Sequence, residues 1–415
     1  EPELWSFQLV GESVGVPAWT LKSSTVTGQP NTITPSNARQ HRSFDFGPDV
    51  AALMSGWRAP FAVFFCWRLV HGLIVVASGG SFFSSAFQFD ARYYLEIAQH
   101  GYILSDPTYG TFQSVAFFPA FPVLAAPFIK VFGIGLGGAL VANGLALAAF
   151  VTVWGVSRSW CGERIARLSI VTMALWPASM FLWAFYTESF FVVLTAGAFW
   201  ADRRGRAWLA VPLVFLAGLT RSVGLVFGPV IVAARLWRLR RVDRTAVGYM
   251  CAWLSSVMVL MLTMRVVAGD WLAFSSAQRA WGRTPSSPWV PISDGVKHVV
   301  SELPRIAQET SMNLASTLLF LGLGVWGTCD AIRSRSEDES RPLEPGLWAL
   351  SATMVPQFTS LISGMLRFMV SSWSGFVLLA RLTNERTIVR WTMWVLFAAV
   401  SVLLLHRYAS NTFVA

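Results

Sequence analysis

An aspartate among aromatic and basic side chains is the part of this chain whose residue types most clearly predict chemistry. Residues 87–102 read FQFDARYYLEIAQHGY and follow the first long apolar segment, so Asp90 stands where the chain should leave a membrane. A carboxylate held at a membrane surface can take a proton from a sugar hydroxyl while neighbouring aromatic rings stack on sugar faces. We therefore take Asp90 as a candidate general base.

The side chains after Asp90 follow helical spacing. Asp90, Tyr93, Tyr94 and Ile97 would share one face of an amphipathic helix lying at the membrane interface. A simpler interpretation stays open, because aspartate commonly begins a helix and aromatic side chains mark membrane interfaces without any catalysis. The neighbours that could contact a substrate are Arg92, Tyr93, Tyr94, His100 and Tyr102.

Charged side chains also interrupt apolar segments further along the chain. Glu188 follows Tyr186 at a tight turn between two apolar segments, where a charge is costly unless it is paired or hydrated. Arg221 stands between two glycines in an otherwise apolar run, and a guanidinium binds phosphate in a bidentate fork. A solvated turn carboxylate and a snorkelling arginine that ends a helix are the simpler alternatives.

Two later segments add weaker candidates, because aromatic and basic residues mark membrane interfaces generally. They are GDWLAFSSAQRAWGR at 269–283, with Gln278, Arg279, Trp281 and Arg283, and GMLRFMVSSWSGF at 364–376, with Arg367. The sequence has no Walker loop, dinucleotide fingerprint, HExxH pair or Cys/His cluster, and its four cysteines read as free thiols. We therefore expect neither a metal nor a cofactor.

The composition is that of an integral membrane protein. The chain has 415 residues, of which 54% are hydrophobic and only 13% are charged, whereas a soluble domain carries about 25% charged residues. The net charge of +10 comes from arginines clustered between apolar segments. That pattern indicates cytoplasmic loops and gives no reason to expect a nucleic-acid partner.

Apolar windows of about 20 residues predict an all-α polytopic bundle of about 11 transmembrane helices. We place them at roughly 58–79, 135–157, 166–185, 188–202, 206–220, 223–239, 245–267, 313–332, 346–363, 368–383 and 389–406. The segment 117–133 contains three prolines and reads as an interfacial or re-entrant piece. Residues 1–57 read as a polar, flexible cytoplasmic tail, and residues 58–415 as the membrane domain.

Arginines predict the orientation of this bundle. They fall on alternate connections, at 158–167, 203–206, 235–244, 333–341 and 381–390, which places those connections in the cytoplasm. The same alternation places two large loops, 80–134 and 268–312, outside, together with Glu188, Arg221 and Arg367. Every candidate side chain therefore falls on one face of the membrane.

The motifs and their order resemble the PIG-V family, which contains GPI mannosyltransferase 2 and its bacterial relatives, within the GT-C membrane glycosyltransferases. The resemblance rests on FDARYYLEIAQHGY (89–102), AFFPAFPVL (116–124), the PAS…YTESFF block (177–191), LTRSVGL (219–225), DWLAFSSAQRAWGR (270–283) and LRFMVSSWSGF (366–376). Phe89 replaces a tryptophan often found before the aspartate in that family, and Ser222 and Val223 depart from its Ser-Asn pair.

This resemblance implies a GT-C-type bundle whose large outer loops bear interfacial helices. It implies inverting transfer of mannose from a polyprenyl-phosphate-mannose donor to a lipid-linked, glycolipid or glycoprotein acceptor. Asp90 would be the base, and the outer arginines Arg221, Arg367, Arg279 and Arg283 would bind the donor phosphate. The membrane would be the bacterial plasma membrane, with the site outside, or that of the endoplasmic reticulum in a eukaryote.

Two alternatives stay open at this point. One keeps the GT-C fold but uses another polyprenyl-linked sugar, such as arabinose or glucose. The other is a multispan lipid or solute transporter, which predicts internal repeats and helices broken near the middle of the membrane.

Overall fold

The computed structural model describes residues 56, 58–81, 83–103, 114–301, 309–336 and 341–412. The chain divides into two units, Glu1–Phe46 and Gly47–Ala415, and all described residues belong to the second. The expected tail, 1–57, therefore lies outside the described residues apart from Gly56.

The α-helices and the short 3₁₀-helices of the described residues, the latter labelled η, follow in chain order. They are α2 (Arg58–Ala77), η1 (Ser84–Phe87), α3 (Ala91–His100), η2 (Ser114–Ala116), α4 (Ala120–Leu175), η3 (Ser179–Leu182), α5 (Glu188–Arg203), α6 (Ala207–Gly218), η4 (Ser222–Val226), α7 (Phe227–Leu239), α8 (Arg244–Ala268), α9 (Ala273–Ser276), η5 (Ala277–Trp281), α10 (Val290–Ser301), α11 (Glu309–Arg333), η7 (Ser334–Ser336), α12 (Glu344–Met354), η8 (Val355–Phe358), α13 (Met365–Phe368), α14 (Ser374–Thr383) and α15 (Thr387–Ala409). The expected all-α class is confirmed.

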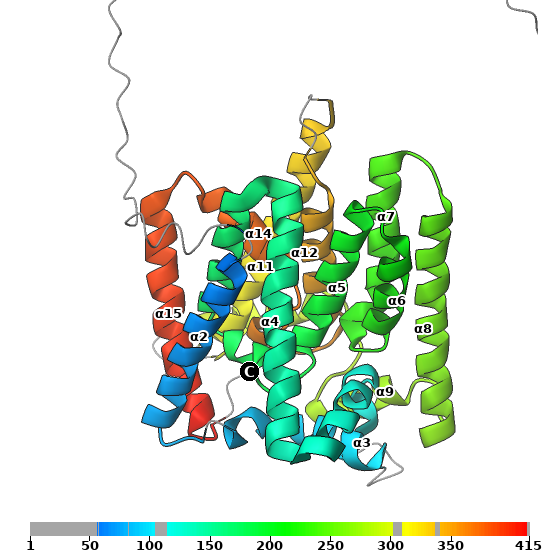
Figure 1. The fold of residues 1–415 in the computed structure, drawn as a ribbon, viewed down its shortest axis with the longest axis vertical. Coiled ribbons are helices and arrows are strands. Elements are labelled where there is room, and N and C mark those ends of the chain that lie inside the picture. The colour runs from blue at the N-terminus through cyan, green and yellow to red at the C-terminus, as the bar shows by residue number, and fades with distance from the viewer. Residues whose placement is uncertain are drawn as a thin grey trace, which may run out of the picture. The chain divides into compact units, whose positions relative to one another are not determined.

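Six of these helical stretches are long and apolar enough to cross a membrane, so the expected count of 11 spans is not confirmed. They are α2, α4, residues 222–239, α8, α11 and α15. The shorter apolar helices are α6 and α14. Figure 1 shows α2 and α15 on one side of the bundle, α6, α7 and α8 on the other, and α3 with α9 below it.

Helix α4 differs from the expected spans because it joins three of the predicted pieces. It runs from Ala120 to Leu175 with kinks at Gly133 and Gly162, whose φ angles are 75° and 81°. Only glycine adopts such angles without steric cost, so the two glycines allow the chain to change direction. The proline-containing segment expected at the interface is thus the first helical piece of α4, and Pro127 lies inside it.

Two expected spans end early, and both early ends lead into the candidate site. The span expected at 166–185 stops at Leu175, and Trp176–Thr187 follows as buried turns around η3. The span expected at 346–363 stops at Met354, because Pro356 cannot continue the helix. Non-helical backbone at membrane depth is tolerated where protein covers it, and Trp176–Thr187 is covered throughout.

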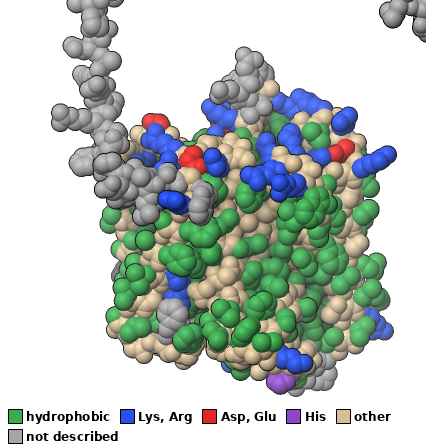
Figure 2. Space-filling model, in the orientation of Figure 1, with side chains coloured by type: hydrophobic (Ala, Val, Ile, Leu, Met, Phe, Trp, Pro, Cys, Tyr) green, Lys and Arg blue, Asp and Glu red, His purple; other side chains and the backbone are tan. Residues whose placement is uncertain are grey.

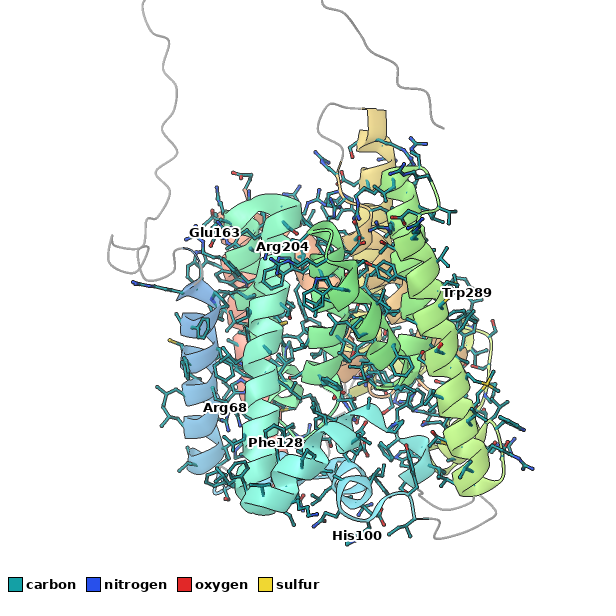
Figure 3. The ribbon with its side chains drawn as sticks, turned by 45° about the vertical axis from the view of Figure 1, so that its right-hand side comes forward. Arg68, His100, Phe128, Glu163, Arg204 and Trp289 are labelled. Carbon is teal, nitrogen blue, oxygen red and sulfur yellow. The ribbon has the colours of Figure 1, made fainter. Side chains whose placement is uncertain are left out.

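The two ends of the bundle differ in charge. Figure 2 shows Lys and Arg side chains gathered along the upper edge of the face it draws, above a hydrophobic surface. Figure 3 places Glu163 and Arg204 at that end and His100 at the opposite end, below α4. Positive residues are retained on the cytoplasmic side, so this distribution favours a cytoplasmic upper end.

We expect impermeant thiol reagents to distinguish the two ends. In a background without the four native cysteines, Ser287→Cys, in the 268–312 loop, should be labelled from outside the cell. Ser159→Cys, beside Arg158 in α4, should be labelled only after permeabilisation. Both serines lie at the surface of the protein. If Ser159→Cys but not Ser287→Cys is labelled in intact cells, the protein has the opposite orientation in the membrane.

Candidate functional site

Asp90 lies at the start of α3 but does not cap it. Its backbone has helical angles and its carboxylate makes no capping hydrogen bond to α3. The preceding residue, Phe89, has a φ of 55°, a conformation that is rare for a bulky side chain. The simpler interpretation, in which Asp90 only begins a helix, therefore does not account for where its carboxylate points.

Arg367 binds that carboxylate. Its Nη1 donates to Oδ2 of Asp90 at 2.9 Å, and its Nε donates to Oε1 of Glu188 at 2.6 Å. Burial alone would lower the pKa of Arg367, but Glu188 and Asp90 beside it hold the pKa well above its usual value. Arg367 is thus a permanent cation that joins α13 to the starts of α3 and α5.

Glu188 is the most deeply buried charge of the group. It is the first residue of α5, where the helix dipole favours an anion, and its side chain is 0% exposed. Arg221 approaches it from the turn before η4, with Nη1 at 3.1 Å from Oε1. One carboxylate oxygen therefore lies between two guanidinium groups.

Aromatic rings fill the spaces between the guanidinium groups. Arg367 lies 4.4 Å from the centre of the Tyr186 ring. Phe368 is shared, because Arg221, Arg283 and Arg367 lie 5.4, 5.3 and 5.9 Å from its ring centre. Such cation–π contacts keep like charges close together in a partly desolvated site.

Arg283 is the third cation of the group, and among the described residues no carboxylate lies within ion-pair distance of it. Its Nη2 donates to the Ser363 carbonyl at 2.6 Å and its Nη1 to Oγ1 of Thr359 at 3.3 Å. Burial lowers the pKa of Arg283 to about 10, so the side chain is still a cation at neutral pH. Both partners are neutral, and the positive charge of Arg283 is not balanced by them.

These side chains line one cavity of about 720 Å³, a size that accommodates a small-molecule ligand. Asp90, Arg221, Arg283 and Arg367 all contribute to its wall. Tyr93, Phe117 and Trp281 form an aromatic part of the wall: Tyr93 stacks on Phe117 at 4.8 Å, and Trp281 meets both rings edge-on at 5.8 and 5.6 Å. The cavity thus joins a side lined by arginines to an aromatic side.

More than half of the chain, including the segments that bear Asp90 and Arg221 but not Arg283 or Arg367, matches a known family. Residues 66–282 match the model of the mannosyltransferases called PIG-V. The chain belongs to the PIG-V mannosyltransferase family. With its apolar helices, this family membership makes it an integral membrane protein.

Individual relatives match a smaller part. The chain is 32% identical over 151 residues to GPI alpha-1,6-mannosyltransferase 2 of Cricetulus griseus, which is 34% of this chain and 29% of that protein. It is 31% identical over 152 residues to the Mus musculus protein of the same name, again 34% and 29%. The match therefore spans less than a third of the length of these curated relatives.

Solved structures that resemble this chain include proteins from two organisms. One is the Archaeoglobus fulgidus oligosaccharyltransferase tethered with an acceptor peptide, with a TM-score of 0.49 and 12% identity over 87% of this chain and 56% of that chain. The other is ArnT from Cupriavidus metallidurans bound to undecaprenyl phosphate, with a TM-score of 0.40 and 13% identity over 83% and 78%. Family membership rests on the sequence match.

The structure gathers most of the side chains predicted from sequence around the cavity. Those that line it are Asp90, Arg92, Tyr93, Tyr94, Arg221, Gln278, Trp281, Arg283 and Arg367. Tyr186 and Glu188 lie buried behind the wall. The remaining three, His100, Tyr102 and Arg279, do not line it. His100 and Arg279 are exposed, and the Tyr102 hydroxyl donates to the Phe117 carbonyl at 2.8 Å.

Phe117 and Phe368 are among the residues of the site that were not predicted. Phe117 lies in the FFPAF motif and Phe368 in LRFM, but an apolar residue in an apolar chain carries no local signal of function. For Phe368 the sequence does contain one signal of a place in the site: it directly follows Arg367 and lies in the same short helix.

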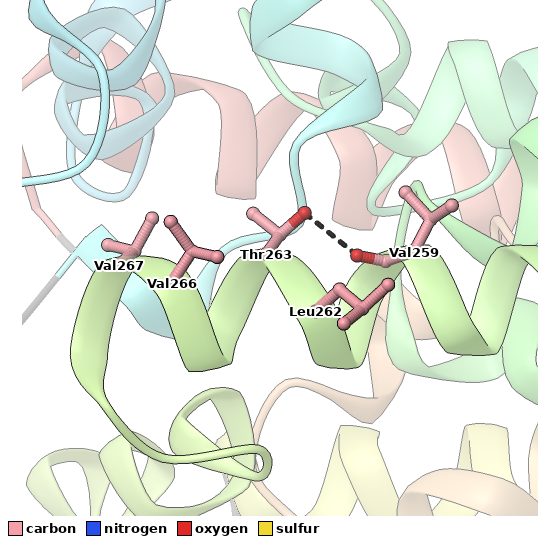
Figure 4. A pocket seen from close by; sticks show the side chains of 5 residues that line it. All are labelled: Val259, Leu262, Thr263, Val266 and Val267. Carbon is pink, nitrogen blue, oxygen red and sulfur yellow. Dashed lines mark hydrogen bonds between the residues drawn. The ribbon is translucent and has the colours of Figure 1, made fainter.

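A second hollow, on α8, offers no comparable chemistry. It has a volume of about 330 Å³ and is lined by Val259, Leu262, Thr263, Val266 and Val267. Figure 4 shows that its one polar side chain, Thr263, is hydrogen-bonded to the Val259 carbonyl, at 2.8 Å. Within the described residues, no group of three or more His, Cys, Asp or Glu side chains is placed to hold a metal ion.

We expect Glu188→Gln to destabilise the protein strongly. The change keeps the shape of the side chain but leaves Arg221 and Arg367 without their shared buried anion, and breaking a buried ion pair costs about 3–5 kcal/mol. The free energy of unfolding in detergent is the measurement.

Glu385→Gln is the matched control for Glu188→Gln. The Glu385 side chain is 80% exposed and lies 3.8 Å from Arg164, so its loss should leave stability unchanged. Equal stability of the two variants would show that Glu188 does not hold the arginines together.

Proposed function

We propose that this chain is a membrane glycosyltransferase that transfers mannose from a polyprenyl-phosphate-mannose donor to a membrane-linked glycan acceptor, on the extracytoplasmic side and with inversion. One observation carries the proposal: a carboxylate, Asp90, and four guanidinium groups, those of Arg92, Arg221, Arg283 and Arg367, line the same cavity. The activity printed for the curated relatives supports the choice of mannose.

The charges of the site suit an anionic donor. Arg221, Arg283 and Arg367 bring three positive charges and Asp90 and Glu188 two negative ones, and Arg92 adds a further positive charge at the cavity wall. The excess of positive charge is favourable for the negative charge of a sugar phosphodiester. A guanidinium binds phosphate oxygens through paired N–H groups, which fixes orientation as well as charge.

In the proposed reaction, an acceptor hydroxyl attacks the anomeric carbon of the donor sugar from the side opposite the phosphate. Asp90 takes the hydroxyl proton as the new C–O bond forms. The bond between the anomeric carbon and the phosphate oxygen breaks, and its electron pair leaves with the phosphate. The arginines stabilise the second negative charge that develops on the leaving phosphate.

The aromatic wall gives the sugars a place to bind. Apolar faces of sugar rings pack on aromatic side chains, whereas their hydroxyl groups need polar partners at the edge. Trp281 and Tyr93 supply the rings, and Gln278 and Arg92 supply polar groups from the same wall. Asp90 pairs with Arg367 at 2.9 Å and lies three residues before Tyr93 in the chain, so it connects the arginine side of the cavity to the aromatic side.

We expect Asp90→Asn to reduce transfer by about 10²-fold or more, because the amide keeps the size of the side chain but cannot accept the proton. Transfer of radiolabelled mannose from a polyprenyl-phosphate donor in membranes is the measurement. Asp294→Asn is the control, since Asp294 is an exposed residue paired with Lys297 at 3.0 Å. Near-normal transfer by Asp90→Asn would exclude Asp90 as the base.

We expect Arg283→Gln to weaken donor binding by about 10- to 100-fold. A charge-assisted hydrogen bond contributes about 1.5–3 kcal/mol, and Arg283 is the cation of the group with neutral partners. Substitution of Arg221 or Arg367 should also weaken donor binding. Both arginines pair with Glu188 as well, so their substitution would lower the stability of the protein at the same time, and the two effects would be hard to separate.

Arg279→Gln is the matched control for Arg283→Gln. Arg279 lies four residues before Arg283, in η5, and is exposed outside the cavity. Titration of purified protein with the donor lipid gives both affinities. Equal affinities of the two variants would contradict the assignment of Arg283 to the donor phosphate.

A further inference from the structure

Tyr186 is buried behind the cavity and contacts the backbone on both sides of Phe89, the residue before Asp90. Its hydroxyl accepts a hydrogen bond from the Asp90 backbone N–H at 3.2 Å and donates one to the Gln88 carbonyl at 3.0 Å. The residue is 2% exposed and does not line the cavity. The sequence predicts that Tyr186 contacts a substrate. Because its side chain does not line the cavity, such a contact would need a different arrangement of the side chains around it.

The segment that Tyr186 holds is a strained turn. Between Gln88 and Asp90 stands Phe89, with its φ of 55°. A non-glycine residue keeps such a conformation only where its surroundings hold it. The Phe89 ring packs on Tyr408 at 5.6 Å, and the Tyr186 hydroxyl fixes the backbone directly before and after Phe89.

The same side chain also holds the partner of Asp90. The Tyr186 ring lies against the Arg367 guanidinium, at 4.4 Å, and Arg367 donates to Oδ2 of Asp90. Burial raises the pKa of the Tyr186 phenol well above its usual value. The hydroxyl therefore keeps its proton, and with it the hydrogen bond to Gln88, throughout the pH range in which carboxylates and imidazoles titrate.

We propose that Tyr186 is the positioning residue of Asp90: it holds the turn at residues 88–90 so that the carboxylate faces the cavity. This inference rests on the proposed function, because it assigns Asp90 the role of base. Tyr186 touches neither donor nor acceptor. Its effect on the reaction passes through Asp90, whose side chain is still 23% exposed beside Arg367.

The test is Tyr186→Phe, which keeps the ring beside Arg367 and removes both hydrogen bonds to the turn. We expect the transfer rate at saturating donor to fall by about 10-fold or more, since a small displacement of a reacting group is enough for such a loss. Donor affinity should stay within about twofold, because the arginines keep their contacts.

Tyr408→Phe is the matched control. Tyr408 is another buried tyrosine of this aromatic cluster, and its hydroxyl has no hydrogen-bond partner among the described residues. Its substitution should leave the transfer rate unchanged. A rate equal to that of Tyr408→Phe, or a weakened donor affinity with an unchanged rate, would overturn the proposal for Tyr186.

A double substitution separates positioning from general damage. In the Asp90→Asn background, Tyr186→Phe should cause less than about a twofold further loss, because residues that act as a unit are not additive. An equal loss in both backgrounds would mean a role independent of Asp90 and would overturn the inference. Failure of the proposed function appears separately, as normal transfer by Asp90→Asn alone.

Hydrogen exchange tests the contact in the unsubstituted protein, should Tyr186→Phe fail to fold. The Asp90 amide is expected to exchange as slowly as the interior of α3, because it is bonded to a buried hydroxyl. Exchange as fast as that of exposed residues near His100 would show that Tyr186 does not hold the turn.

Discussion

The buried carboxylate of Glu188 is the constraint on which the rest of the site depends. A charge at this depth is stable only when it is paired, and Glu188 finds its partners, Arg221 and Arg367, far away along the chain. The pairing ties the start of α5 to the turn before η4 and to α13. Arg367 then reaches Asp90 from its fixed position, so the candidate base is oriented by an ion pair that the fold cannot do without.

This pairing explains why two helices end before they cross the bundle. If α4 continued as a helix beyond Leu175, or α12 beyond Met354, the chain could not turn to place Tyr186 and Arg367 beside the start of α3. Irregular backbone at this depth needs hydrogen bonds from protein, and the Phe185 amide finds one at the Ala86 carbonyl, at 2.8 Å. The site therefore occupies the region where regular helices give way to buried turns.

The sequence predicts the kinds of residue in the site better than their contacts. Asp90, Glu188, Arg221 and Arg367 are found because a charge in an apolar chain requires an explanation, and the cavity or its buried wall contains all of them. Their pairing cannot be read from spacing, because partners such as Asp90 and Arg367 come from opposite ends of the chain. Local pattern does not show which residues line the cavity: His100, Tyr102 and Arg279 share the motifs of the cavity residues but do not line it. The count of 11 spans is not confirmed, because several of the expected spans form helices shorter than a membrane is thick or join into one long helix.

The two ends of α5 show what distinguishes a site from a structural network. At its far end, three arginines pair with three carboxylates among the described residues, in a closed set: Arg203, Arg235, Arg238, Asp202, Asp243 and Glu344. Tyr249 adds a hydrogen bond to Asp202 at 2.9 Å. At the near end, three arginines meet two carboxylates and open into a cavity. A balanced network gains nothing from a further ion, whereas an excess of positive charge in a partly desolvated cavity is relieved by an anion. Buried ion pairs therefore occur at both ends of α5. At one end they are balanced and hold the fold together, and at the other they leave an excess of positive charge at the cavity.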